Sequence, residues 1–305
     1  MTPDDPAFTY DEFAYFDENC SEYSLALVDP VPVVRREVAV DGRAVSMLRW
    51  GTGSPQLVFL HGGAQNAHTW DTVLLAMGCP RAVCFDLPGH GHSAHCDDGM
   101  YDPRTHAATL AAALDMIAVA GPVVLVGMSM GGLTANALAA RRPELIGRLV
   151  VIDVTPGVNR DKASEIVAFV AGPQAFASFD EILARTVEFN PTRAESSLRR
   201  GILHNAHRLA DGSWEWNYDR THFDAEGLAT MGSLWDDVAA IGCPVTLVRG
   251  ADSPVVDDAD VAEFLRLQPD GTVRVIEGAG HSIQGDRPVE LAELLSDELA
   301  GLTPG

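Results

Sequence analysis

The chain has 305 residues, of which 47% are hydrophobic, so it holds enough apolar material to bury a large core. Its formal net charge is −22, because 43 acidic side chains stand against 21 basic ones, and this argues against nucleic acid or an anionic membrane as a partner. The sequence contains no run of about 18 apolar residues, so we expect no membrane span.

Residues 1–32 are acidic and aromatic with several prolines, and we expect them to form an N-terminal arm. They lack the basic and apolar regions of a secretory signal, which predicts a cytoplasmic protein. The five cysteines are scattered and form no CxxC pair. Neither a disulfide framework nor a zinc site is therefore expected, and a reducing compartment fits.

Strands come first in the remainder of the chain, and strands then alternate with helices. Asp41-Gly42 between two apolar runs is a strong hairpin signal. The predicted strands are Val33–Val40, Ala44–Trp50, Gln56–Leu60, Ala82–Asp86, Val123–Val126, Leu149–Val154, Val245–Arg249 and Thr272–Glu277. The predicted helices are Arg104–Ala120, Leu133–Arg142, Asp258–Leu267 and Asp286–Leu299. This order predicts an α/β fold, with a mostly parallel central sheet and helices on both faces.

The strand pattern stops between Thr155 and Gly242, where the sequence is helical in character and carries aromatic clusters. An insertion of about 85 residues between two strands is too long for a plain loop. We expect a helical cap over the carboxyl edge of the sheet. The predicted organisation is an arm over 1–32, a core over 33–154 and 243–305, and a cap over 155–242.

A GxSxG motif at residues 127–131 directly follows an apolar strand and precedes a predicted helix. In this context the motif is typical of a nucleophile elbow, a tight turn that lifts the serine hydroxyl clear of the sheet. The flanking glycines leave room for the turn, and the helix dipole favours negative charge beside Ser129. The alternative is a Gly-rich turn that only lets strand and helix pack closely. We predict that Ser129 is a nucleophile.

A serine nucleophile needs a base, because a free hydroxyl is a poor nucleophile. Among the ten histidines, His281 is best placed, since it follows the Gly-rich run 278–280 just past the last predicted strand. From such a loop its ring can reach back to the elbow. The other histidines are expected to be ordinary surface or core residues.

Four segments together resemble the α/β-hydrolase superfamily. They are His61-Gly62-Gly63, Asp86-Leu87-Pro88-Gly89-His90-Gly91-His92-Ser93, Gly127-Met128-Ser129-Met130-Gly131-Gly132 and Gly278-Ala279-Gly280-His281. Their order and spacing cover about residues 33–300, and the resemblance implies the α/β-hydrolase fold with the serine ahead of its histidine. It also implies that the backbone N–H groups of Gly63 and Met130 form an oxyanion hole. The segment from Asp86 to Ser93 would be structural.

The resemblance offers two positions for the acid that orients the histidine. One is the loop after Val245–Arg249, usually as Gly-x-x-Asp, but here Ser253 holds the expected place and Asp252 comes one residue early. The other is the end of the strand after the nucleophile helix, where Asp153 stands and where pancreatic lipase and certain small bacterial esterases carry their acid. Those esterases also have Gly-x-x-Ser-Pro and Asp-x-x-Pro runs like those at 250–254 and 153–156. We favour Asp153, with Asp252 as the alternative; a helix N-cap is the structural interpretation of Asp153.

Trp70 and Met128 lie near the predicted site in the sequence, and we expect them to line a substrate pocket, with core packing as the alternative for each. No group of His, Cys, Asp and Glu has metal-ligand spacing, so neither a metal nor another cofactor is expected.

The sequence therefore predicts a serine hydrolase that cleaves a small-molecule carboxylic ester, thioester or lactone. Ser129 would form an acyl-enzyme, His281 would move the proton, and Asp153 would orient His281. Two alternatives remain: a C–C bond hydrolase of the meta-cleavage type, which shares this layout, and a ligand-binding receptor that keeps the hydrolase fold with little turnover.

Overall fold

The computed structural model describes residues 2–302, apart from residues 6, 97, 98, 100 and 220–231. Its centre is an eight-stranded sheet in the order β1-β2-β4-β3-β5-β6-β10-β11. The strands are β1 Val33–Val40, β2 Arg43–Trp50, β3 Leu57–Leu60, β4 Ala82–Phe85, β5 Val123–Met128, β6 Ile146–Ile152, β10 Val245–Gly250 and β11 Thr272–Ile276. Strand β2 is antiparallel to β1 and β4, and the six strands from β4 to β11 are parallel. The predicted fold class is confirmed.

The two turn residues of the first hairpin determine how β1 and β2 pair at the edge of the sheet. Asp41 and Gly42 join β1 to β2 with positive φ angles of 49° and 78°. Positive φ at both central residues is the two-residue turn whose twist matches that of paired strands. The turn pairs Val40 with Arg43 and fixes the register of the whole hairpin.

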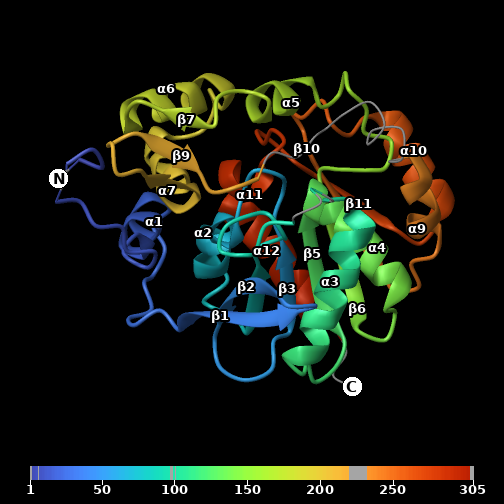
Figure 1. The fold of residues 1–305 in the computed structure, drawn as a ribbon. Coiled ribbons are helices and arrows are strands. Elements are labelled where there is room, and N and C mark those ends of the chain that lie inside the picture. Colours follow the sequence, from blue (N-terminus) through green and yellow to red (C-terminus); the bar gives the residue numbers. More distant parts are fainter. Residues whose placement is uncertain (1, 6, 97–98, 100, 220–231, 303–305) are drawn as a thin grey trace.

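Helices cover both faces of the sheet, and alternate residues of each strand point to opposite faces. In β3, Val58 and Leu60 pack in one apolar cluster, and Leu57 and Phe59 pack in another. The first cluster includes residues of α3 Pro103–Met116, α4 Met130–Arg141, α9 Trp235–Ala239 and α10 Asp258–Leu267. The second includes residues of α1 Phe16–Glu22, α2 Asp71–Ala76, α11 Ile283–Asp286 and α12 Pro288–Ala300. Figure 1 shows α3 and α4 on one side of the strands and α12 on the other.

Most of the described residues between β6 and β10 lie above the carboxyl edge of the sheet, and this segment is called the cap below (Figure 1). Its helices are α5 Ser164–Val170, α6 Phe179–Phe189 and α7 Glu195–Asn205, and the 3-10 turn η2 Gly232–Leu234 leads back to α9. The sequence did not predict the three short strands that lie beside these helices and form a small sheet in the order β7-β9-β8. They are β7 Ala175–Phe176, β9 Trp214–Trp216 and β8 Ala206–Arg208. Strands of two or three residues are too short to show an alternating pattern.

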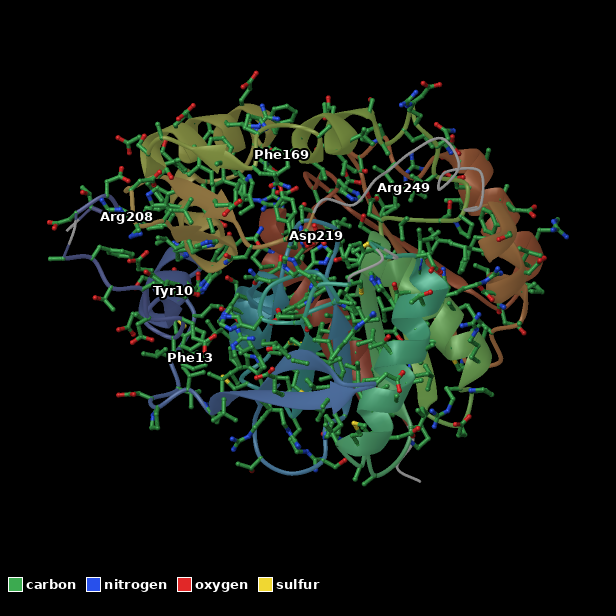
Figure 2. All side chains as sticks on the ribbon, viewed as in Figure 1. Tyr10, Phe13, Phe169, Arg208, Asp219 and Arg249 are labelled. Atoms are coloured by element: carbon green, nitrogen blue, oxygen red, sulfur yellow. The ribbon has the colours of Figure 1, made fainter. Side chains whose placement is uncertain are left out.

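The N-terminal arm contacts both the core and the cap. Phe16 and Cys20 of α1 are buried in the core cluster on one face of the sheet, whereas Tyr15 is buried in the cluster that fills the cap. Figure 2 shows Tyr10 and Phe13 where the arm meets these two parts. No helix in the described parts of the chain is both long and apolar enough to cross a membrane.

Candidate active site

Ser129 lies in a sharp turn between β5 and α4, with φ 53° and ψ −123°. A positive φ strains a residue that has a Cβ, and such strain is concentrated at functional sites. The turn is held because the Ser129 N–H donates to the Ile152 carbonyl at 3.1 Å, while its carbonyl accepts from Gly132 N at 2.8 Å. A side chain at Gly131 would overlap the Leu60 and His61 carbonyls, and one at Gly127 would overlap the Gly131 backbone. The glycines are therefore a steric requirement of this turn.

His281 and Asp153 meet beside this turn from two different loops. Asp153 follows β6, is fully buried, and its Oδ2 lies 2.8 Å from Nδ1 of His281. The same carboxylate accepts hydrogen bonds from Gly250 N at 3.1 Å and from the Ser253 hydroxyl at 2.5 Å. Because Asp153 occupies Nδ1, the Nε2 of His281 is left to face a substrate or Ser129. Ser129 and His281 line the same cavity.

Asp252 is placed differently from Asp153. Its backbone N–H donates to the Ala279 carbonyl at 3.0 Å, and the residue lines the cavity. Among the described carboxylates, the one hydrogen-bonded to Nδ1 of His281 is that of Asp153. Ser253, which holds the position where the resemblance suggested an acid, donates its hydroxyl to Asp153 instead.

The loop after β3, residues His61–Gln65, lies directly against the serine turn and is called the β3 loop below. A Cβ at Gly62 would meet Sδ of Met128 at 2.6 Å and Cβ of Ser129 at 3.2 Å, so the two segments are in close contact. A Cβ at Gly63 would meet no atom within 4 Å, so open space lies beside this residue.

The N–H groups of the β3 loop differ in what they bind. The Gly62 N–H donates to Oε1 of Gln65 at 3.1 Å, and the Ala64 N–H donates to Nε2 of His90 at 3.2 Å. Among the hydrogen bonds of the described residues, the Gly63 N–H has no acceptor. With open space beside it, the Gly63 N–H is therefore available to a ligand.

His61 fixes the direction of that free N–H. Its Nδ1 donates to the Gly62 carbonyl at 2.7 Å, and its Nε2 accepts from Leu87 N at 2.9 Å. Burial lowers the pKa of His61 to about 4, so the ring is neutral and can act as donor and acceptor at once. In a trans peptide the C=O and the following N–H point in opposite directions. Binding the Gly62 carbonyl therefore aims the Gly63 N–H away from His61.

A cavity of about 480 Å³ lies between the core, the cap and the arm. Its apolar wall comes mainly from the cap: Ile166, Phe169, Val170, Phe189, Ile202 and Trp216. Figure 2 shows Phe169 in the cap, above the sheet. Met128 lines the cavity as expected, but Trp70 does not. Trp70 is fully buried against Phe59, with ring centroids 5.0 Å apart, so it belongs to the core.

Several residues around the cavity were not found by sequence reasoning. Asn19 and Tyr23 of the arm line it, as do Asn66 of the core and Asn205 at the end of α7. No local motif marks these four positions. They come together only because the arm and the cap pack against the 3-10 turn η1 Ala67–Trp70 and the β3 loop.

Three buried residues are close enough to share a cation, since ligand atoms of His68, Asp71 and His204 lie within 4.8 Å of one another. The two imidazoles, however, are stacked with centroids 4.0 Å apart and 10° between their planes. A nitrogen lone pair lies in its ring plane, so two parallel rings cannot both point at one ion. Burial would lower the pKa of His68, but the carboxylates of Asp71 and Glu12 outweigh it and raise the pKa to about 9. The group is better suited to hold a protonated imidazole than a metal.

A family model described as "Alpha/beta hydrolase family" matches residues 57–294. Esterase Rv0045c of Mycobacterium tuberculosis (strain ATCC 25618 / H37Rv) is 45% identical over 304 residues, covering 97% of this chain and 98% of that protein. A solved structure of that esterase, from work on its transition metal inhibition and structural refinement, has a TM-score of 0.84 and 42% identity, covering 96% of this chain and 100% of the other. The sn-1-specific diacylglycerol lipase ABHD11 of Mus musculus is 28% identical over 256 residues, or 81% of each chain.

Proposed function

The chain belongs to the alpha/beta hydrolase family and acts on ester bonds, and we propose that it cleaves carboxylic esters through an acyl-enzyme on Ser129. The observation that carries this proposal is the hydrogen bond between His281 and the buried Asp153, beside a serine held in a strained turn. A base oriented by a third group next to such a serine is the arrangement used for nucleophilic catalysis.

In the first half of the reaction, Oγ of Ser129 attacks the carbonyl carbon of the ester while Nε2 of His281 takes the hydroxyl proton. The imidazolium then gives this proton to the leaving alcohol as the C–O bond breaks. In the second half, His281 takes a proton from water, the hydroxide attacks the acyl-enzyme, and Ser129 recovers its proton as the acid leaves. Asp153 holds the ring so that Nε2 faces Ser129 and stabilises the imidazolium.

The negative charge that develops on the carbonyl oxygen is stabilised by the N–H groups of Gly63 and Met130 in this proposal. Gly63 supports the assignment because its N–H is free and open space lies beside it. Met130 is the first residue of α4, and the first N–H groups of a helix have no partner within the helix. The positive end of the helix dipole acts on the same oxygen.

The cavity favours an ester with an apolar group. Its cap wall is aliphatic and aromatic, and such a wall binds an acyl or alkyl chain by the hydrophobic effect. A thioester or lactone needs the same nucleophile, base and oxyanion donors. These are therefore further substrates of the proposed mechanism.

The test is hydrolysis of p-nitrophenyl esters of increasing acyl length by the wild type and by Ser129→Ala. We expect Ser129→Ala to lose activity by about 10⁴-fold or more. Ser213→Ala, in an exposed cap turn, is the matched control and should keep wild-type activity. A fluorophosphonate probe should add its phosphonyl group to Ser129, as peptide mass spectrometry would show.

A folded wild type that hydrolyses no ester would contradict the proposal. Turnover of a vicinal oxo-enol substrate would then favour the C–C hydrolase, and tight binding without turnover would favour the receptor. The mechanism uses only side chains and backbone groups of this chain. We therefore expect EDTA to leave the activity unchanged.

A further inference from the structure

We propose that Asn205, at the end of cap helix α7, is a positioning residue that holds the β3 loop in its active shape, so that seating of the cap completes the oxyanion hole. The inference rests on the proposed function and deepens it. It assigns to the cap a part in the chemical step, in addition to its part in enclosing the substrate.

Ala64 is the residue that follows Gly63 in the β3 loop. Ala64 has φ 58°, a left-handed conformation that costs free energy in a residue with a side chain. Such a conformation persists only if the surroundings hold it. Both polar groups of Ala64 are held: its N–H donates to His90 at 3.2 Å, and its carbonyl accepts from Nδ2 of Asn205 at 2.6 Å.

The two groups that hold Ala64 come from different parts of the molecule. His90 belongs to the core, in the loop after β4, and burial lowers the pKa of His90 to about 3, so its ring is a neutral acceptor. Asn205 belongs to the cap. The core therefore fixes one peptide of the β3 loop, while the next peptide depends on the cap.

Asn205 is itself held in one orientation. Nδ2 of Asn66 donates to Oδ1 of Asn205 at 3.2 Å and to the carbonyl of His204 at 2.8 Å. These bonds identify the oxygen of the Asn205 amide and turn its NH2 group toward Ala64. Asn66 is in turn fixed by the core, because its Oδ1 accepts from His68 N at 3.0 Å. Asn66 and Asn205 are both buried, which limits the competition of water for these bonds.

Loss of the Asn205 donor would leave the Ala64 carbonyl without its partner. The strained φ angle of Ala64 could then relax. Gly63 precedes Ala64 and has no side chain to resist the change. The Gly63 N–H would then be oriented only by the bond of His61 to the Gly62 carbonyl, so its direction toward the developing oxyanion would be less exact. Oxyanion donors act through orientation set before the reaction, so the transition state should be affected more than substrate binding.

The principal test variant is Asn205→Asp, which keeps the size and the acceptor oxygens but removes the donor. Asn66→Asp is a second variant, since it keeps the Oδ1 that accepts from His68 and removes the donor that orients Asn205. Asn217→Ala is the matched control. Its side chain contacts His207 in the outer part of the cap, and only its backbone N–H bonds to Asn205.

The measurements are kcat and KM on one p-nitrophenyl ester, with active sites counted by fluorophosphonate labelling so that misfolded protein does not contribute. Two alkyl ketones of equal chain length complete the set. A trifluoromethyl ketone forms a tetrahedral adduct with an oxyanion, and a methyl ketone occupies the cavity without forming it. We expect Asn205→Asp to lower kcat by about tenfold or more. The affinity for the trifluoromethyl ketone should fall by a similar factor. KM and methyl ketone affinity should stay within about twofold, since Asn205→Asp keeps the size of the side chain in the cavity wall.

Asn66→Asp should also lower kcat and the affinity for the trifluoromethyl ketone, but by a smaller factor. Asn217→Ala should match the wild type in both. Wild-type kcat in both aspartate variants would overturn the inference while leaving the proposed function intact. A loss that falls equally on both ketones and on KM would also overturn it, because it would show only a damaged cavity. If the wild type hydrolyses no ester, the proposed function and the inference fail together.

Discussion

The serine turn and the cap that covers it are held in place by different kinds of interaction. Ser129 is positioned by main-chain geometry, through a strained φ angle, backbone hydrogen bonds and glycines that allow backbone to approach backbone. The cap and the arm are held to the core and to each other by side-chain hydrogen bonds and ion pairs between residues far apart in the sequence. Short local motifs thus fix the nucleophile, whereas long-range contacts shape the rest of the cavity.

The arm illustrates the second kind of interaction. Arg35 of β1 pairs with Glu12 at 2.7 Å and with the buried Asp86 at 2.8 Å. Glu12 also bonds His68 at 3.1 Å, and the hydroxyl of Tyr10 bonds Nδ1 of His204 in the cap at 2.7 Å. Arm, core and cap therefore meet in one partly buried network of charged and polar groups.

A methyl group added to each region should have opposite effects. In Gly131→Ala the new Cβ would overlap two backbone carbonyls, so we expect a loss of about 3 kcal/mol in the free energy of unfolding and a large loss of activity. In Gly201→Ala the Cβ would meet nothing within 4 Å inside α7, so we expect a gain of about 0.5–1 kcal/mol. Urea unfolding measures both. Equal stability of the two variants would show that the contrast between the regions is wrong.

The charge on His68 should make the stability of the arm–core junction depend on pH. The pKa of His68 is raised from 6.5 to about 9, so its stabilising effect is complete below pH 6.5 and is lost as the pH rises through 9. We expect His68→Gln to be less stable than the wild type by about 1–3 kcal/mol at pH 6, with a difference that shrinks by pH 10. The free energy of unfolding at the two pH values measures this.

The exposed cap residue His207 provides the control for that experiment. His207→Gln should match the wild type at both pH values, because the side chain is half exposed and lies outside the network. A difference between wild type and His68→Gln that stays constant from pH 6 to pH 10 would exclude a charged imidazole at position 68.

A smaller loss of stability is expected from breaking the contact between the start of the arm and the cap. Oδ1 of Asp4 accepts from Nε1 of Trp214 at 2.8 Å and from Phe179 N at 3.0 Å. Asp4→Ala leaves the buried indole N–H of Trp214 without this partner, so we expect a loss of about 1–1.5 kcal/mol in urea unfolding. Asp5→Ala is the control, since among the described residues the hydrogen bond of the Asp5 side chain stays within the arm, where it accepts from Ala7 N. Equal stability of the two variants would mean that this contact does not tie the arm to the cap.

Much of the core could be predicted from the sequence, because its signals are local. Strand β1 and helix α10 have the expected bounds, since a hairpin turn and an acidic capping residue delimit them. The expected strand Leu149–Val154 lies at 146–152 instead, because Asp153 leaves the strand with a φ of 50°. The expected helix Asp286–Leu299 lies at 288–300 instead, because Pro288 begins α12 and the separate short helix α11 ends at Asp286.

The cap and the arm could not be predicted to the same depth. Helix α1 and the three cap strands are short, and tertiary packing rather than periodicity defines them. Trp70 was placed in the pocket from its closeness in sequence, but a neighbour in sequence can point to the opposite side of the chain. The division into arm, core and cap and the cytoplasmic location stay predictions.

The most direct test of the proposed mechanism compares Asp153→Asn with Asp252→Asn in ester hydrolysis. The two substitutions are chemically identical and differ only in which carboxylate is removed from the neighbourhood of the site. Asp153→Asn should lower kcat by about 10⁴-fold, because the asparagine no longer stabilises the correct His281 tautomer and the imidazolium. Asp252→Asn should stay within a few-fold of the wild type. A large loss in Asp252→Asn with an active Asp153→Asn would contradict the account and move the acid to the loop after β10.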